Sequence, residues 1–172
     1  MENLSNNIQV VCEARVNNTE KVETIKTIMN QFIEGNEFVD DRFEGKYYVI
    51  RASGGDSLQI FGEWVRQSYL LDTIRRRLLK SIRNTMTSLY FNRQAAAMGR
   101  ISLVDIDDNP PNGAIMLTII ADNLEELIDI ITPKTYRGRE LTEAEWEKVK
   151  LQQLREQEKK KRQDQKKSKS NF

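Results

Sequence analysis

The side chains best suited to chemistry in this chain are cations, and they gather between Arg66 and Arg100. Eight lysines and arginines stand there against a single acid, Asp72, although the whole chain has a formal net charge of only +1. Guanidinium and ammonium groups donate hydrogen bonds and neutralise phosphates, and they do not accept protons at neutral pH. The clustering therefore predicts a polyanionic partner, and we expect RNA.

The middle of this stretch, YLLDTIRRRLLKSIRN, has the periodicity of an amphipathic helix over about residues 69–83. Its leucines and isoleucines fall mainly within one arc of the helical wheel, which predicts a face packed on a sheet. The opposite arc is cationic, because basic residues recur there at i, i+4 and i+7. The cations expected to contact phosphates are Arg76, Lys80 and Arg83, with Arg77 beside them.

This cationic face has two interpretations. It binds phosphates, or it is simply a solvated surface, since charged helix faces are common. Charge elsewhere favours binding: residues 101–132 contain seven acids and no lysine or arginine, so the folded domain has an electrostatic dipole that steers a polyanion to one side. Arg75 lies nearer the apolar arc, where it forms an internal ion pair or lays its stem along apolar surface.

Nearby aromatic residues also have two interpretations. Tyr69, Tyr90 and Phe91 are close enough in sequence to stack on unpaired bases. Aromatic residues in strands, however, are more often part of the core. Both interpretations stay open for each of the three.

Catalytic chemistry has little support in the sequence. The chain has no histidine, which excludes a histidine general base, a histidine triad and a Cys/His zinc site. The single cysteine, Cys12, alternates with apolar residues and is predicted to be a buried structural thiol, which agrees with a reducing cytosol. Asp105, Asp107 and Asp108 could bind a hard metal, but their setting favours a turn. We therefore expect neither an enzyme nor a cofactor.

Alternating and helical patterns predict an α+β fold with a largely antiparallel sheet and helices packed on one face. Strands are expected at 8–16, 37–43, 46–52, 86–91, 100–106 and 114–121, the last two pairing across a turn at 109–113. Helices are expected after caps at Asn18 or Thr19, at Asp56 or Ser57, and at Asp122 with Glu125.

The chain is predicted to have one domain over 1–140 and a charged C-terminal helix from 141 to 172. Thr142 and Glu145 form a capping box at the start of that helix. Beyond Glu156 the sequence is polar and cationic, so we expect the helix to fray into a basic disordered tail. No apolar run approaches the length of a membrane span, and the N-terminus does not resemble a signal peptide.

Several short motifs resemble an uncharacterised conserved protein family of archaea that is grouped with predicted RNA-binding and exosome-associated proteins. The most specific is Asn92-Arg93-Gln94-Ala95-Ala96, preceded by Phe91 and followed by Gly99. Phe91 and Arg93 differ mildly from the family pattern, in which Leu and Lys are commoner. Further matches are Thr19-Glu-Lys-Val22, Ser57-Leu58, Arg66, Leu71-Asp72-Thr73, Arg75 and Asn112-Gly113-Ala114-Ile115.

The resemblance covers roughly residues 8–138 and has several implications. It implies an α+β fold similar to a ribosomal protein that binds the small ribosomal RNA of the large subunit. It also implies a homodimer in the cytoplasm of an archaeon and a possible place in an RNA-processing complex. Because a fold does not determine a function, the RNA-binding role remains an analogy at this point.

The Asn-Arg-Gln-Ala-Ala segment is open to two interpretations. Its polar residues present donors to phosphates or base edges, or its small residues allow tight packing while Gln94 bonds to the backbone. Packing is favoured for the alanines. The sequence thus predicts a non-catalytic RNA-binding protein, or alternatively an assembly adaptor that uses the same basic face. The predicted RNA-binding residues are Arg76, Arg77, Lys80, Arg83, Arg93, Gln94 and Arg100.

Overall fold

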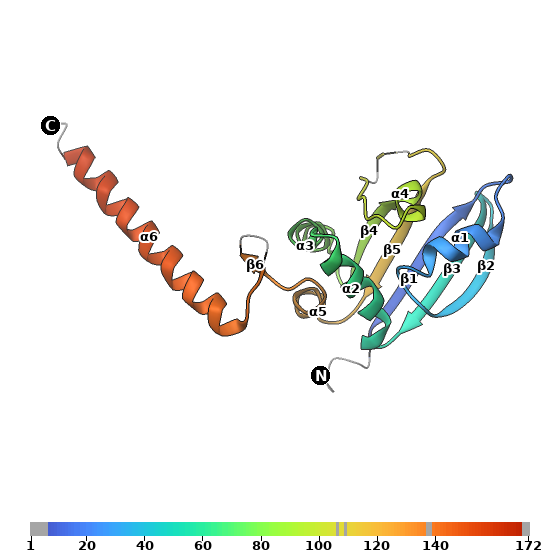
Figure 1. The fold of residues 1–172 in the computed structure, drawn as a ribbon, viewed down its shortest axis with the longest axis horizontal. Helices are drawn as coiled ribbons and strands as arrows, with labels where there is room; N and C mark the ends of the chain where they lie inside the picture. The colour runs from blue at the N-terminus through green and yellow to red at the C-terminus, as the bar shows by residue number, and fades with distance from the viewer. Residues whose placement is uncertain (1–6, 106, 109, 137–138, 170–172) are drawn as a thin grey trace. The chain divides into compact units, whose positions relative to one another are not determined.

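The structure is a computed structural model that describes residues 7–105, 107–108, 110–136 and 139–169. Internal contacts divide the chain into two units, Met1–Pro133 and Lys134–Phe172. The first unit contains the sheet, and the second contains a short hairpin and the C-terminal helix (Figure 1). The boundary between the units lies between Pro133 and Lys134, seven residues before the boundary predicted at 140/141, because the hairpin groups with the C-terminal helix.

The first unit is built on a five-stranded sheet in which every neighbouring pair is antiparallel. In space the strands follow the order β2-β3-β1-β5-β4, so β2 and β4 are the two edges. Alternating apolar residues produce this sheet, because every second side chain points to the same face. The strands are β1 (Gln9–Val16), β2 (Asn36–Arg42), β3 (Gly45–Ser53), β4 (Met86–Asn92) and β5 (Ala114–Ile120).

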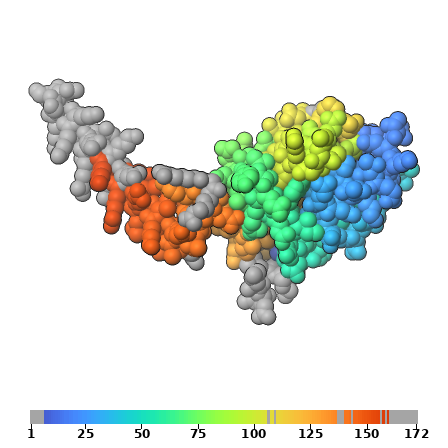
Figure 2. Space-filling view, in the orientation of Figure 1, coloured from blue at the N-terminus to red at the C-terminus, as the bar shows by residue number. Residues whose placement is uncertain are grey.

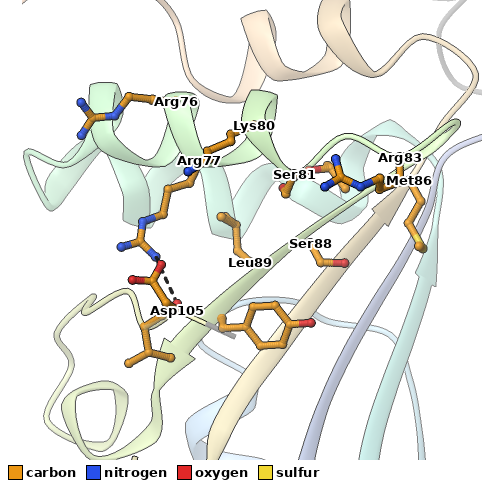
Figure 3. A pocket seen from close by; sticks show the side chains of 12 residues that line it. Arg76, Arg77, Lys80, Ser81, Arg83, Met86, Ser88, Leu89 and Asp105 are labelled. Carbon is orange, nitrogen blue, oxygen red and sulfur yellow. Dashed lines mark hydrogen bonds and ion pairs between the residues drawn. The ribbon is translucent and has the colours of Figure 1, made fainter. Parts of the chain in front are cut away.

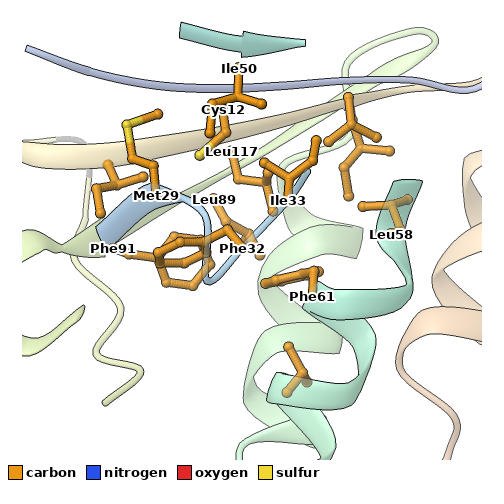
Figure 4. Close-up of a cluster of buried hydrophobic side chains, with 14 of the residues drawn as sticks. Cys12, Met29, Phe32, Ile33, Ile50, Leu58, Phe61, Leu89, Phe91 and Leu117 are labelled. Carbon is orange, nitrogen blue, oxygen red and sulfur yellow. The ribbon is translucent and has the colours of Figure 1, made fainter. Parts of the chain in front are cut away.

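Helices cover the face of the sheet that presents Cys12, Ile50 and Leu117, which lie in register across β1, β3 and β5. Their apolar stripes and this sheet face form one continuous core, shown in Figure 4. The predicted α+β class with helices on an antiparallel sheet is therefore confirmed. The helices are α1 (Val22–Met29), the 3₁₀ turn η1 (Gly55–Leu58), α2 (Gln59–Gln67), α3 (Leu71–Lys80), α4 (Arg93–Ala97) and α5 (Leu124–Ile131).

The predicted strand at 100–106 was wrong. Only one isolated bridge forms in this stretch, between Leu103 and Phe91 of β4, and Ile106 lies outside the described residues. The predicted hairpin with β5 is absent because β5 already has β1 on one edge and β4 on the other. A strand has only two edges, so no position beside β5 remained. Residues 100–105 instead run along the outer edge of β4.

All three predicted helix caps were displaced. The N-cap of α2 is Leu58, without a side-chain cap bond, so neither Asp56 nor Ser57 caps that helix. Lys21 precedes α1 without a side-chain cap bond, so neither Asn18 nor Thr19 caps that helix. Before α5 the cap is Asn123, one residue after the predicted Asp122, and its side-chain oxygen accepts a hydrogen bond from the Glu126 backbone N–H at 3.4 Å. Each shift is within the usual uncertainty of a helix boundary read from sequence.

The second unit contains the hairpin β6 (Thr135–Tyr136) and β7 (Arg139–Glu140), followed by α6 (Glu143–Lys169). The predicted capping box forms, because the Thr142 amide donates to the Glu145 carboxylate at 3.0 Å. Helix α6 continues past Glu156, where fraying was expected, since its Glu, Lys, Gln and Arg residues are all good helix formers. Among the described residues no helix combines the length and apolarity that crossing a membrane requires.

Candidate nucleic-acid interface

Helix α3 is fixed to edge strand β4 by polar contacts at its C-terminal end. The Thr87 hydroxyl donates to the Leu78 carbonyl at 2.7 Å and lies 2.6 Å from the Ser81 hydroxyl. Because Leu78 and Thr87 are both buried, these bonds satisfy groups that water cannot reach. The inner face of α3 is thereby held against the sheet, and its cationic face is turned outward as predicted.

A tight turn carries the chain from α3 into β4. Asn84 adopts a left-handed backbone conformation, with φ 54°. The backbones of Arg83 and Met86 then exchange two hydrogen bonds, of 2.8 and 3.0 Å. This turn places Arg83 at the beginning of β4, next to the last turn of α3.

Helix α3, strand β4 and the segment at 104–105 line a hollow of about 700 Å³, which we call the basic groove. Figure 3 shows Arg76, Arg77 and Lys80 projecting from α3, with Asp105 on the opposite side. Four of the seven predicted residues are thus brought together in one place. The groove is lined by Arg76, Arg77, Lys80, Ser81, Arg83, Met86, Thr87, Ser88, Leu89, Tyr90, Val104 and Asp105.

The four cations of the basic groove differ in how far they are already engaged. Arg77 donates to the Val104 carbonyl at 3.1 Å and to the Asp105 carboxylate at 2.9 Å. Arg83 donates only to a backbone carbonyl, and both Arg76 and Lys80 are exposed without an ion pair among the described residues. The groove therefore keeps positive charge that the described residues do not neutralise.

The floor of the groove contains unpaired backbone groups of the sheet edge. The Thr85 carbonyl accepts from the amide of Ala121, just after β5, whereas the backbone N–H and C=O of Met86 bond to Arg83 on the other side. Along an antiparallel strand the backbone groups of successive residues point alternately to the two sides, so every second residue from Met86 points away from β5. Ser88 therefore points its N–H and C=O away from β5. No described residue bonds to these two groups, because the outer segment reaches β4 only at Tyr90 and Asn92.

Arg93 does not lie in the basic groove, contrary to the sequence-based prediction. Its side chain is only 3% exposed, and its guanidinium donates to both oxygens of the Glu20 carboxylate at 2.8 and 2.9 Å. It also donates to the Arg15 carbonyl at 2.5 Å. Arg93 thus joins the start of α4 to the segment that follows β1, and its charge is consumed inside the protein.

Gln94 and Arg100 are exposed, but neither lines the basic groove. Arg100 follows the end of α4, where Gly99 at φ 69° reverses the chain and the Arg100 amide bonds to the Ala95 carbonyl at 3.0 Å. Figure 2 shows the yellow-green surface that follows β4 meeting the green surface of the helices. Arg100 and Trp64 line a separate hollow. Packing was predicted for the three alanines of this segment; Ala96 is fully buried and Ala95 half-buried, whereas Ala97 is exposed.

The three aromatic candidates are separated by the fold. Phe91 is fully buried in the core, and Tyr69 is 94% exposed outside the groove. Tyr90 is half-buried and lines the groove, so it alone of the three lies beside the free cations. Alternation along β4 explains the difference between Tyr90 and Phe91, because adjacent residues of a strand point to opposite faces of the sheet.

The other predictions about individual side chains can be compared with their surroundings. Of the two alternatives predicted for Arg75, the internal ion pair forms, with Asp129, and Arg75 also donates to the Thr132 carbonyl at 2.9 Å. Cys12 is buried as predicted, and burial, with a smaller contribution from Glu13, raises the pKa of its thiol far above the usual range. Within the described part of the chain no three potential ligands gather as a metal site would require.

The chain is similar to known archaeal proteins in both sequence and structure. The chain is 32% identical over 133 residues to a UPF0201 protein of Saccharolobus solfataricus, and the alignment covers 76% of this chain and 91% of the relative. A crystal structure of a UPF0201 protein from Methanococcus jannaschii has a TM-score of 0.65 at 27% identity, covering 78% of this chain and 99% of that one. No family model matches the chain.

A more distant likeness concerns the fold alone. The structure of a DUF54 protein from Archaeoglobus fulgidus has a TM-score of 0.55 at 14% identity, and the match covers 76% of this chain and 100% of that one. The arrangement of helices on an antiparallel sheet is therefore shared beyond proteins of similar sequence.

Proposed function

The chain belongs to the UPF0201 family of archaeal proteins, and on that premise we propose that it binds RNA through the phosphate backbone in the basic groove. Arg76, Lys80 and Arg83 contact phosphates, and Arg77 contributes less because Asp105 already engages it. No catalytic step and no cofactor is part of this proposal. The observation that carries it is a groove with several cations and one acid, on a chain that is almost neutral overall.

Two further features support the proposal. Arg76 and Lys80 are exposed on α3, so a polymer can reach them from solvent. Its cations stand on a helix and a tight turn, which fix their spacing. The family's grouping with predicted RNA-binding and exosome-associated proteins agrees with this function, and a homodimer within an RNA-processing complex is the setting we expect.

The test is the salt dependence of RNA binding. Replacing Arg76, Lys80 and Arg83 together by Ala should lower the slope of log K against log salt concentration by about 2–3 units, since each phosphate contact releases condensed counterions. Binding of a fluorescein-labelled RNA, followed by anisotropy at several salt concentrations, measures this slope.

A charge-matched control variant distinguishes the contribution of the groove to RNA binding from that of the protein's net charge. Lys21, Lys46 and Lys148 are exposed and lie outside the groove, and replacing all three by Ala removes the same charge. We expect the control to leave the slope nearly unchanged. Equal slopes for the two triple variants would contradict the proposal, as would a groove variant that binds RNA like the wild type.

The free edge of β4 favours one second candidate, an assembly adaptor. An extended acidic segment of a partner could pair with the unpaired N–H and C=O of Ser88 and place its carboxylates against α3. In this case the groove recognises a peptide backbone, and its cations provide the preference for acidic side chains.

The variant Ser88→Pro distinguishes the two functions. Proline removes an N–H that points away from β5, so the pairing of β4 with β5 is preserved while a new strand is blocked. RNA binding with an unchanged salt slope in Ser88→Pro supports the RNA function. Loss of binding to an acidic peptide in the same variant, without affinity for RNA in the wild type, would support the adaptor.

A further inference from the structure

The face of the sheet opposite the helices carries an unusual set of side chains. Strand registers place Phe38, Val49, Glu13, Met116 and Tyr90 in one row that crosses all five strands on this face. No helix of the first unit, within its described residues, packs on this row, because the helices contact the opposite face. We call this surface the open face.

Part of the open face forms a second hollow, of about 560 Å³. Tyr47 and Tyr90 line it together with Arg15, and the turn at 110–113 forms one rim. Tyr90 also lines the basic groove, so the two hollows meet at this side chain. A polymer lying in the groove therefore passes over the Tyr90 ring where it extends onto the open face.

Guanidinium groups and aromatic rings are interleaved on this face. Arg42 lies over the Tyr47 ring, 4.4 Å from its centroid, and Arg51 lies over the Phe38 ring at 4.9 Å. Arg42 is fixed further by hydrogen bonds of 3.1 and 2.8 Å to Glu13, which neutralise that carboxylate. Their planar guanidinium groups offer stacking surfaces for bases, although the charge of Arg42 is already engaged by Glu13 and Asp40.

Tyr90 differs from the other rings on this face. No guanidinium lies over it among the described residues, and its hydroxyl has no hydrogen-bond partner there. Its ring is half-buried, which fixes its position without hiding it. It is therefore an available stacking surface beside free cations.

We infer that the open face binds the unpaired bases of a single-stranded RNA segment whose phosphates occupy the basic groove. This inference rests on the proposed function and adds the class of RNA. Bases of a single strand can turn toward Tyr90 and stack on it, whereas the bases of a duplex are already paired and stacked on each other. Stacking on aromatic and guanidinium planes tolerates any base. This subsite therefore distinguishes unpaired from paired strands but does not distinguish one base sequence from another.

The experiment uses the full chain and an unstructured RNA of roughly ten nucleotides, a length within the range that single-strand sites cover. The RNA contains one 2-aminopurine, whose fluorescence is quenched when it stacks. Tyr90→Leu removes the ring and keeps an apolar side chain of the edge strand. Tyr69→Leu is the matched control, because Tyr69 is 94% exposed and lines neither hollow.

The wild type is expected to bind the single strand more tightly than a duplex of equal length. Tyr90→Leu should weaken single-strand binding about 10-fold, the effect of losing one base stack, and leave duplex binding unchanged. It should also restore the 2-aminopurine fluorescence. Tyr69→Leu should behave as the wild type in all three measurements.

Other outcomes overturn either this inference or the function on which it rests. Equal affinity for single strand and duplex, or unchanged binding in Tyr90→Leu, overturns the base subsite while phosphate binding in the groove stands. A wild-type dimer that Tyr90→Leu converts to a monomer without RNA affinity assigns the open face to a second copy of the chain. If the triple variant of the groove keeps its salt slope but Tyr90→Leu loses affinity, the phosphate assignment fails and the base subsite stands.

Discussion

Two arginines from the same basic stretch, Arg76 and Arg93, have opposite roles in the folded protein. Arg93 is 3% exposed and its guanidinium is shared between Glu20 and a backbone carbonyl. Arg76 is exposed at the mouth of the basic groove and has no ion pair among the described residues. The first arginine holds two parts of the fold together, and the second leaves its charge available to a partner.

The difference shows that a cluster of cations in a sequence is not yet a binding surface. A buried guanidinium must have its donors satisfied, since an unpaired buried charge is costly. An exposed one gains little from any single partner in water, so its removal hardly affects folding. Stability and binding therefore report on different arginines, and measurements of both can separate them.

The largest effect is expected from Arg93→Met. This substitution leaves the Glu20 carboxylate and the Arg15 carbonyl without their donor and should lower the free energy of unfolding by about 2–4 kcal/mol. This loss of unfolding free energy is at the lower end for a buried ion pair because Glu20 is partly exposed. Urea denaturation followed by circular dichroism measures it. Arg76→Met is the control and should stay within about 0.5 kcal/mol of the wild type; similar losses in both variants would break the comparison.

An intermediate effect is expected from Arg75→Met. Arg75 joins α3 to the end of α5 through Asp129 and the Thr132 carbonyl, but Asp129 is half-exposed and its pairing is screened by water. We expect a loss of about 1–2 kcal/mol in the free energy of unfolding. Because Arg75 does not line the groove, the affinity for RNA below the unfolding transition should be unchanged. A loss of RNA affinity in the folded variant would show that Arg75 is part of the binding surface.

The smallest effect should distinguish two neighbours on α3. Arg76→Ala should lower the salt slope of RNA binding by about 1 unit, and Arg77→Ala by roughly half as much, because Asp105 already engages Arg77. Asp105→Asn should then increase the contribution of Arg77 and raise the affinity for RNA. Anisotropy titrations of the three variants at matched salt concentrations measure these changes. Equal slopes for Arg76→Ala and Arg77→Ala would show that the internal ion pair does not limit Arg77.

Much of the fold could be predicted from local patterns. Alternation along β1 and β5 and the helical spacing of α3 each require only a few consecutive residues, and all three elements formed where expected. The predicted strand at 100–106 failed for a reason that no local pattern contains. Its apolar residues alternate well enough, but the strand beside which it was placed had both edges filled by other strands.

The amino-acid sequence by itself determined the excess of positive charge between Arg66 and Arg100, the face of α3 that carries it and the absence of histidine chemistry, because these depend on residue type and short-range periodicity. Only the tertiary structure decided which of those charges remain free. Arg93 meets Glu20 across 73 residues of sequence, and Arg77 meets Asp105 across 28. Such pairs form when distant segments are packed together, so the division between structural and available cations is a property of the fold.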